Sequence, residues 1–428
     1  MHDVLDPRDV VPDEAEQLAV SGYAVGNLGA AAHAAAADGD LAALAEIERA
    51  LALVARDPAW PYVEPDEDGT LLDDLRDIEP VRVNQPLASR IRGAWLGRAV
   101  GNTLGKPVEG LARNEVETYL RAAGQWPQTG YVALLDPLPE GVSHLHPSAP
   151  SATAGNFVDV PRDDDIDWTI LGLFVLERHG RDVTTGQIGA AWLDRLPFTQ
   201  TYTAERAAYR NLIHGIVPPE TATRANPYRE WIGALIRGDI FGLVNPGDPA
   251  SAARMALADA RLSHVANGIY GEMWAAALVA SATAADSMVD TYASALAVVP
   301  PGSRLAEVLR KVSTLRDGGA TWPQALDWVD AALARYSWVH TLNNAAIIAI
   351  ALLWGGDFTE ATGISIAGGR DTDSTTATVG SVFGALHGDD AIPAALVGTT
   401  HVHIRSAVRD FDRITIDELA ARTMKLIA

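Results

Sequence analysis

The chain has 428 residues, 48% of them hydrophobic, which is enough for a large core and, at roughly 150 residues per domain, for two or three domains. It contains no cysteine, so disulfide frameworks, zinc–thiolate sites, iron–sulfur clusters and thiol nucleophiles are excluded. A formal net charge of −22 without a basic patch argues against binding to a nucleic-acid backbone.

The N-terminal 86 residues are predicted to form an acidic helical extension. Residues 1–80 hold 19 Asp and Glu but four Arg, so most of the net negative charge lies there. The alanine-rich stretch 20–55 predicts two helices, because alanine loses little entropy in a helix. Prolines and an acidic run predict a linker at 57–86. We interpret residues 1–86 as a regulatory or docking segment or as a solvated appendage, and expect the extension to be dispensable for chemistry.

No segment reaches the roughly 18 uninterrupted apolar residues of a membrane span. The first residues, MHDVLDPRDVV, are acidic where a signal peptide is basic and then apolar. We therefore expect a cytoplasmic protein without membrane attachment, and leave its oligomeric state open.

Residues 87–428 are predicted to form one all-α domain. Apolar residues recur at helical spacing between short Pro and Gly breaks, and alternating strand patterns are scarce. The pattern predicts roughly ten or more helices. The stretch 125–163, rich in Gly, Pro and Ser, predicts a long loop.

Two segments of this domain repeat glycine every four residues, which places the glycines on one helix face although each costs about 1 kcal/mol in a helix. Such a bare face lets another helix approach closely, so both segments are expected at the centre of the bundle. The glycines are Gly93, Gly97, Gly101 and Gly105 in the first segment, and Gly380, Gly384 and Gly388 in the second.

Acidic residues gather at two predicted helix starts. Asp163, Asp164, Asp165 and Asp167 precede or open a helix, and because neighbouring carboxylates repel, a cation is expected among them. The alternative is a solvated N-cap. A second group contains Asp371, Asp373 and Ser374, and follows a double glycine, Gly368 and Gly369, that permits close approach of a ligand to the backbone. Carboxylates and a hydroxyl favour Mg²⁺, Mn²⁺ or Ca²⁺ over soft metals.

Three motifs together resemble those of the ADP-ribosylglycohydrolase family. They are GAWLGRAVGNTLGKPVEG at 93–110, RDDDIDWT at 162–169 and GGRDTDSTTATVGSVFGALHG at 368–388, with a weaker match at DARLSH, 259–264. The resemblance covers about 88–428. It implies an orthogonal multi-helix bundle with two divalent cations, most simply Mg²⁺, and hydrolysis of a glycosidic bond at a ribose anomeric carbon.

The resemblance also implies roles for individual residues. Its candidate metal ligands are Asp163, Asp164, Asp165, Asp371, Asp373 and Ser374. Asp163 stands where the family usually has threonine. Glu109 matches the glutamate near the scissile bond, and either Glu109 or Asp165 is the expected base, a choice that the sequence leaves open.

The candidate substrate-binding residues are Asn102, His264, Asn267, Gly369 and Arg370. Arg370 is expected to project into the cleft and bind an anion close to the ribose, the alternative being an ion pair with Asp163 or Asp167. His264 is equally well read as a hydrogen-bonded core histidine. Weaker candidates for the cleft are Glu272, His340, Asn343 and Asn344.

Three hypotheses about function remain. The first is a metal-dependent hydrolase of an ADP-ribosylated substrate. The second is the same chemistry on a small N-ribosylated metabolite, because residues 231–242, in the place of the family's phosphate-contacting loop, keep only Gly233 and Arg237. The third is a catalytically silent binding protein with the same fold, which the retained carboxylates disfavour because unpaired buried charge is costly.

Overall fold

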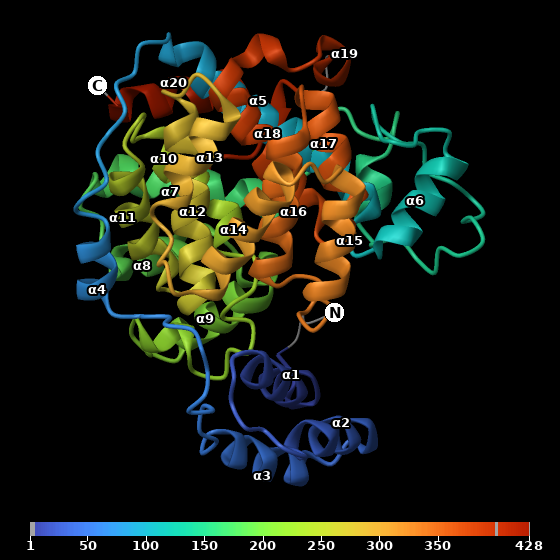
Figure 1. Ribbon diagram of the computed structural model, residues 1–428, viewed down its shortest axis with the longest axis vertical. Helices are drawn as coiled ribbons and strands as arrows, with labels where there is room; N and C mark the ends of the chain where they lie inside the picture. The colour runs from blue at the N-terminus through green and yellow to red at the C-terminus, as the bar shows by residue number, and fades with distance from the viewer. Residues whose placement is uncertain (1–4, 399–400, 428) are drawn as a thin grey trace.

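Two glycine-bearing helices, α5 (Leu87–Gly105) and α18 (Thr372–His387), pack side by side within the computed structural model, which describes residues 5–398 and 401–427 (Figure 1). Their bare faces meet: a Cβ on Gly97 would overlap the carbonyl oxygen of Gly380, and one on Gly93 would lie 2.5 Å from that of Gly384. The predicted close packing of both glycine segments is confirmed.

The glycine contacts also fix the direction of the pair. Gly93 lies against Gly384 whereas Gly105 lies against Thr372, so the two helices run antiparallel. The end of α5 therefore meets the beginning of α18. Because one acidic motif opens α18 and the Lys-Pro-Val-Glu turn follows α5, this packing alone brings the two motifs together.

The N-terminus of a third helix, α7 (Asp164–His179), is tied to α5 by a buried arginine. Arg98 donates from Nε (3.0 Å) and Nη2 (2.6 Å) to the carbonyl oxygen of Asp165, and its Nη1 lies 2.7 Å from Asp239 Oδ2. Asn102 Nδ2 donates to Asp165 Oδ2 at 2.9 Å. The acidic start of α7 is thus held against α5, the helix that also packs against α18.

The remaining helices of this domain enclose the central pair. Every residue of α12 is buried, as expected for a helix that is apolar on all sides. These helices are α6 (Arg113–Ala122), α8 (Thr185–Arg195), α9 (Thr203–Ile213), α10 (Asp239–Leu243), α11 (Pro249–Ala260), α12 (Ala266–Ala282), α13 (Met288–Leu296), α14 (Arg304–Asp317), α15 (Trp322–Ala332), α16 (Thr341–Trp354), α17 (Phe358–Ala367), α19 (Ala394–Val397) and α20 (Ile416–Ile427).

The all-α prediction is confirmed. Within the described residues the strands are β1 (His403–Ile404) and β2 (Ile414–Thr415), an antiparallel pair with His403 opposite Thr415. The predicted loop at 125–163 contains a short 3₁₀ helix, η2 (Ala149–Ala152), and lies with α6 at one side of the molecule (Figure 1). None of the described helices is both long and apolar enough to cross a membrane.

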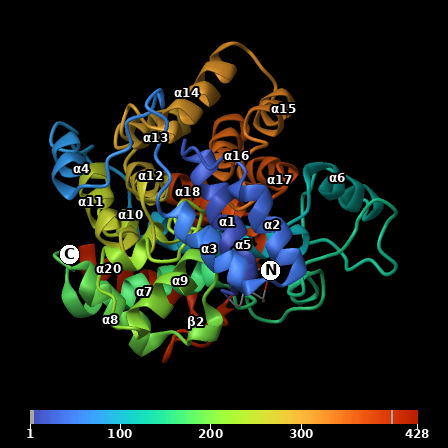
Figure 2. The same cartoon turned by 90° about the horizontal axis from the view of Figure 1, so that it is seen from below.

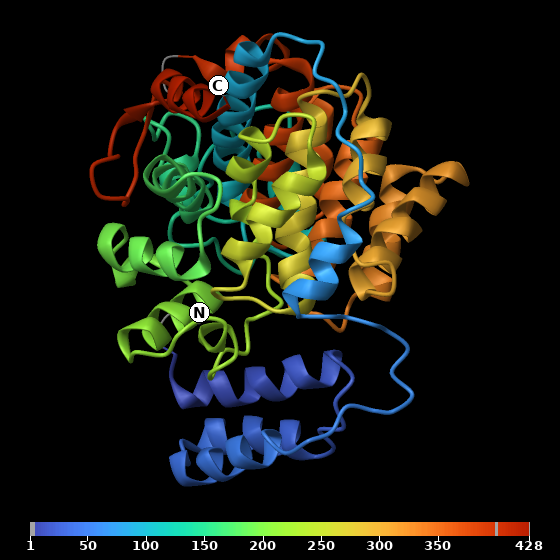
Figure 3. The same cartoon turned by 90° about the vertical axis from the view of Figure 1, so that its left-hand side faces the viewer.

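The first three helices of the N-terminal extension form a layer below the main bundle (Figure 3) and lie in front of it when the molecule is seen from below (Figure 2). These helices, α1 (Pro7–Val20), α2 (Leu28–Asp38) and α3 (Leu41–Leu51), share a small core of their own. The two helices predicted in 20–55 are α2 and α3, whereas α1 was not predicted. The segment 57–86 contains α4 (Asp68–Asp74) and runs up the side of the bundle to α5 (Figure 3).

Candidate metal centre

The acidic starts of α7 and α18 meet around a buried lysine. Lys106 begins the 3₁₀ turn η1 (Lys106–Val108) that follows α5. Its Nζ lies 2.6 Å from Asp163 Oδ2, 2.7 Å from Asp373 Oδ2 and 2.8 Å from Glu109 Oε2. Three chain segments thus each place a carboxylate on one ammonium group.

Helix-capping geometry positions these acids. Asp163 is the N-cap of α7 and accepts a hydrogen bond from the backbone N–H of Asp165 at 3.1 Å. Asp371 occupies the N-cap position of α18. Ser374, in the first turn of α18, donates from Oγ to Asp165 Oδ1 at 3.0 Å and so links the two helix starts.

Backbone geometry explains the double glycine before α18. Gly369 has φ +64° and Arg370 has φ +66°, and a Cβ on Gly369 would lie 2.8 Å from the backbone nitrogen of Arg113. In this structure Gly369 therefore packs against the chain at residues 111–113. The close approach expected for a ligand is made here by the protein's own backbone.

Two groups of three carboxylates have ligand atoms within 4.8 Å of one another, and Asp373 belongs to both. One group is Glu109, Asp371 and Asp373, and the other is Asp163, Asp165 and Asp373. Asp373 Oδ1 is buried and makes no hydrogen bond. An unpartnered carboxylate oxygen among hard oxygen donors fits a divalent cation such as Mg²⁺, Mn²⁺ or Ca²⁺.

The pKa values of the ionisable groups in the site are strongly shifted from their ordinary values. Burial, together with the neighbouring Asp373, raises the pKa of Glu109 to about 8. Burial and Asp163 raise the pKa of Asp164 to about 7. Burial by itself would lower the pKa of Lys106, but its three carboxylate partners raise it well above the ordinary value. Repulsion among the carboxylates would fall if a divalent cation bound among them.

Asp165 and Asp371 show the same effect. Burial and the surrounding carboxylates raise both pKa values well above the ordinary range. Asp163 differs, because Lys106 lowers its pKa despite burial. The lysine thus keeps one acid ionised, while the other acids share an excess of negative charge.

Arg370 lies beside this centre, in a neighbouring cavity. Its Nη2 is 2.6 Å from Asp330 Oδ1, so neither Asp163 nor Asp167 is its partner. With Trp338 it lines a cavity of about 610 Å³ that also includes Gly110, which follows Glu109 directly. Asp167 pairs instead with Arg162, Nε to Oδ2, at 2.7 Å.

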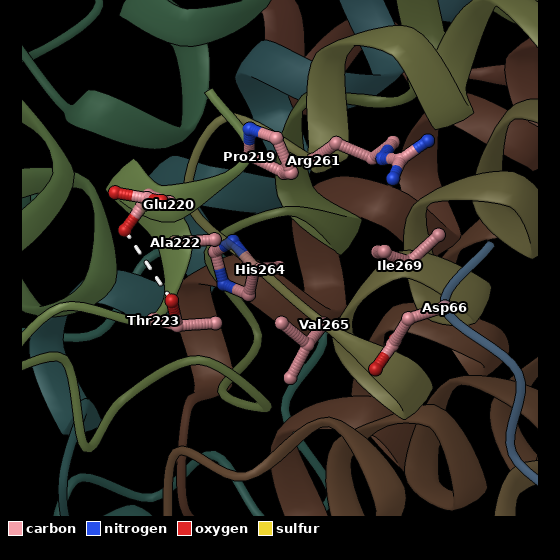
Figure 4. Close-up of a pocket in the computed structure, with 9 residues that line it drawn as sticks. All are labelled: Asp66, Pro219, Glu220, Ala222, Thr223, Arg261, His264, Val265 and Ile269. Atoms are coloured by element: carbon pink, nitrogen blue, oxygen red, sulfur yellow. Dashed lines mark hydrogen bonds between the residues drawn. The ribbon is translucent and has the colours of Figure 1, made fainter. Parts of the chain in front are cut away.

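His264 lies in a different cavity from the one that Arg370 lines. His264 lines a smaller cavity of about 170 Å³ with Asp66 and Arg261 (Figure 4). Its Nδ1 is 2.8 Å from Ser263 Oγ. Because Ser263 also accepts a hydrogen bond from the buried Arg237 at 2.9 Å, His264 belongs to a buried polar network beside the N-terminal segment.

Asn267 likewise binds the N-terminal segment. Its Nδ2 donates to Glu64 Oε1 at 2.8 Å, and its Oδ1 accepts the backbone N–H of Leu305 at 3.0 Å. Asn102, in contrast, contacts the metal centre through Asp165. Of the candidate substrate-binding residues, Asn102 is therefore in direct contact with a candidate metal ligand.

The weaker candidates hold the start of α16 and the interior of the bundle. His340 caps α16 through Nδ1, which accepts the backbone N–H of Leu342 at 3.2 Å. Asn343 and Asn344 donate to the carbonyl oxygens of Ser337 and Trp338, each at 2.8 Å. Glu272 is fully buried, with Arg237 Nε 3.7 Å from its Oε2.

Two residues of the site were missed by the sequence analysis. Lys106 is one of three lysines in the chain and lies in the Gly-Lys-Pro-Val-Glu turn, a signal that was available. His146, from the long loop, places Nδ1 3.3 Å from Glu109 Oε2. No local pattern marks His146, because a loop of this length can fold back in many ways.

Comparison with known proteins gives one family. A family model described as ADP-ribosylglycohydrolase matches residues 84–427. Among solved structures, an "ADP-ribosylglycohydrolase-related protein complex" matches with a TM-score of 0.48 and 22% sequence identity, covering 80% of this chain and 99% of that chain. The comparison with curated proteins finds no match.

Proposed function

The chain belongs to the ADP-ribosylglycohydrolase family, and from this membership we propose that it hydrolyses the bond between a ribose anomeric carbon and its leaving group with the help of a bound divalent cation. The observation that supports the proposal is the convergence of five carboxylates from three chain segments, with an unpartnered oxygen on Asp373. The net charge of −22 favours an ADP-ribosyl group on a protein or a small molecule over a nucleic-acid backbone as substrate.

Cleavage of such a bond passes through an oxocarbenium-like transition state, and a bound divalent cation supplies charge that orients ribose hydroxyls and acidifies water. The proposed metal ligands are Asp163, Asp164, Asp165, Asp371, Asp373 and Ser374. The residues themselves orient one another: Ser374 and Asn102 each donate a hydrogen bond to Asp165, which fixes both of its oxygens. Substrate bound against such a fixed carboxylate would be held in one orientation.

The contacts favour Glu109 over Asp165 as the general base. Both oxygens of Asp165 already accept hydrogen bonds. Glu109 lies between Lys106 and His146, 2.8 and 3.3 Å from its Oε2. These two groups can hold the carboxylate in place, and a nearby cation lowers its pKa so that it accepts a proton from water near neutral pH.

One observation keeps the second candidate substrate class in view. Arg237, in the segment that takes the place of the family's phosphate-contacting loop, forms buried ion pairs with Glu205 and Asp259. A Cβ on Gly233 would overlap the Glu205 carboxylate. Because both retained positions are engaged within the protein, a small N-ribosylated metabolite without a pyrophosphate is the alternative substrate.

The test is hydrolysis of a panel containing ADP-ribosylated proteins, ADP-ribose conjugates and simple N-ribosides, with and without chelator. We expect release of the leaving group in Mg²⁺ or Mn²⁺, loss of activity on chelation, and its return when metal is added. Asp371→Ala should abolish activity and weaken metal binding while the protein keeps its helical circular dichroism. Full activity in protein shown to be metal-free by elemental analysis would refute the metal dependence, and binding of ADP-ribose without any turnover would favour a silent binding protein.

A further inference from the structure

The family resemblance implies two divalent cations, but an ammonium group already lies among the carboxylates. We propose that Lys106 takes the place of one of the two metal ions, so that the centre holds a single divalent cation beside a fixed lysine. The inference rests on the proposed metal dependence and concerns how many ions the site takes.

The number of donors matches the number of acceptors. An ammonium group has three N–H donors and no acceptor, and Lys106 Nζ contacts three carboxylates at 2.6 to 2.8 Å. Its side chain is 9% exposed, so water cannot readily replace these partners. The lysine is therefore a fully paired structural cation.

The residue type supports the same conclusion. Lys106, Lys311 and Lys425 are the three lysines of the chain, and all other cationic side chains apart from histidine are arginines. An ammonium is a compact point charge, whereas a guanidinium is a planar fork suited to one or two carboxylates. Three converging carboxylates can all contact a compact cation, and an ammonium group shares this compact shape with a metal ion.

The position of Lys106 leaves room for one further cation. Lys106 contacts two members of each three-carboxylate group: Glu109 and Asp373 in one, Asp163 and Asp373 in the other. Each group is compact, with its ligand atoms within 4.8 Å of one another, so a divalent ion in each group would lie close to the ammonium group and be repelled by it. Asp373 gives Oδ2 to Lys106 and keeps Oδ1 free of hydrogen bonds, which leaves a ligand for one ion.

The test counts Mn²⁺ ions on the full chain, independently of turnover. Protein stripped with chelator is titrated with Mn²⁺, free ion is measured by electron paramagnetic resonance, and the bound spectrum separates an isolated ion from a spin-coupled pair. We expect one isolated Mn²⁺ per chain. Lys106→Met, which removes the charge but keeps the length, should bind a coupled pair, while Lys311→Met, on the exposed face of α14, should bind one ion as the unaltered chain does.

Two coupled Mn²⁺ ions on the unaltered chain would overturn the proposal, even if hydrolysis proves metal-dependent. A single ion on folded Lys106→Met would overturn it as well. If that variant does not fold, the count on the unaltered chain decides alone. Absence of bound Mn²⁺ from the unaltered chain would overturn both this inference and the proposed metal dependence.

Discussion

Glu109 and Asp164 carry proton affinities that only the folded chain gives them. Their pKa values rise to about 8 and about 7, because burial and neighbouring carboxylates penalise the charged forms. In an unfolded chain both groups would ionise near pH 4. A group whose pKa is raised on folding stabilises the fold below its unfolded pKa, and this contribution is lost as the pH rises through the folded pKa.

The metal-free protein should therefore lose stability between pH 6.5 and 8.5, a window set roughly by these two raised pKa values and by the ordinary histidine pKa. Buried His264 and His340, with pKa values lowered by burial, destabilise the fold only below about 6.5 and do not mask the trend. The free energy of unfolding, measured by urea unfolding at each pH, checks this expected loss of stability.

Glu109→Gln should flatten part of this slope, since the amide does not titrate. Saturating Mg²⁺ should flatten it further, because the cation keeps the carboxylates ionised. A metal-free protein whose unfolding free energy is constant or increases from pH 6.5 to 8.5 would contradict the assignment.

At the residue level, sequence reasoning finds acids more readily than their partners. The carboxylates at the starts of α7 and α18 stand out because local spacing places them at helix N-termini. Arg370 lines the cavity that also includes Gly110, but its ion pair is with Asp330 on α15 and not with Asp163 or Asp167. The partner of Arg370 depends on where α15 packs, and no local sequence pattern predicts the packing position of α15.

At the level of elements, the glycine face between α5 and α18 determines the geometry of the metal centre. The antiparallel contact sets where Lys106 and Asp373 meet, since Gly105 lies against Thr372 and each is followed by a site residue. The sequence predicts the close approach because the four-residue spacing is a local signal. It does not predict which helix meets which, or in what register.

Gly97→Ala should destabilise the protein by about 1–3 kcal/mol or more, because the added methyl overlaps the carbonyl of Gly380 and the helices must separate. Gly186→Ala in α8 is the matched control: a Cβ there meets no atom within 4 Å, and the change should stabilise by up to about 1 kcal/mol. Urea unfolding compares the two variants. We also expect weaker Mn²⁺ binding in Gly97→Ala, and equal stability of both variants would refute the role given to this face.

At the level of the whole molecule, the N-terminal segment 57–86 is built into the bundle. Glu64 has a fully buried side chain that accepts hydrogen bonds from Arg304 Nε (2.7 Å) and Nη2 (2.9 Å). Arg304 also donates to Glu230 (2.7 Å) and to the carbonyl oxygen of Val20 (3.0 Å). One arginine thus joins α1, the connecting segment and the bundle. Sequence reasoning could not find this link, because Glu64 and Arg304 are 240 residues apart.

These contacts change what we expect from truncation. A chain starting at Asp57 loses α1–α3, which have their own core, but keeps Glu64 against Arg304. It should fold, bind Mn²⁺ and lose a modest part of its stability. A chain starting at Val83 also removes Glu64 and its hydrogen bonds to Asn267 and Arg304, and breaking a buried ion pair costs about 3–5 kcal/mol.

We therefore expect the chain from Val83 to be much less stable than the chain from Asp57. The sequence alone suggested that the whole extension is dispensable, because all the site motifs begin at or after residue 93. Thermal unfolding followed by helical circular dichroism compares the two, with Glu64→Gln in the full chain as the single-residue control. Glu64→Gln should account for a large share of the difference, because it removes one of the two carboxylate charges that Arg304 faces without removing any backbone contact. Equal melting temperatures for both truncated chains would show that Glu64 and its neighbours are not needed to hold the bundle together.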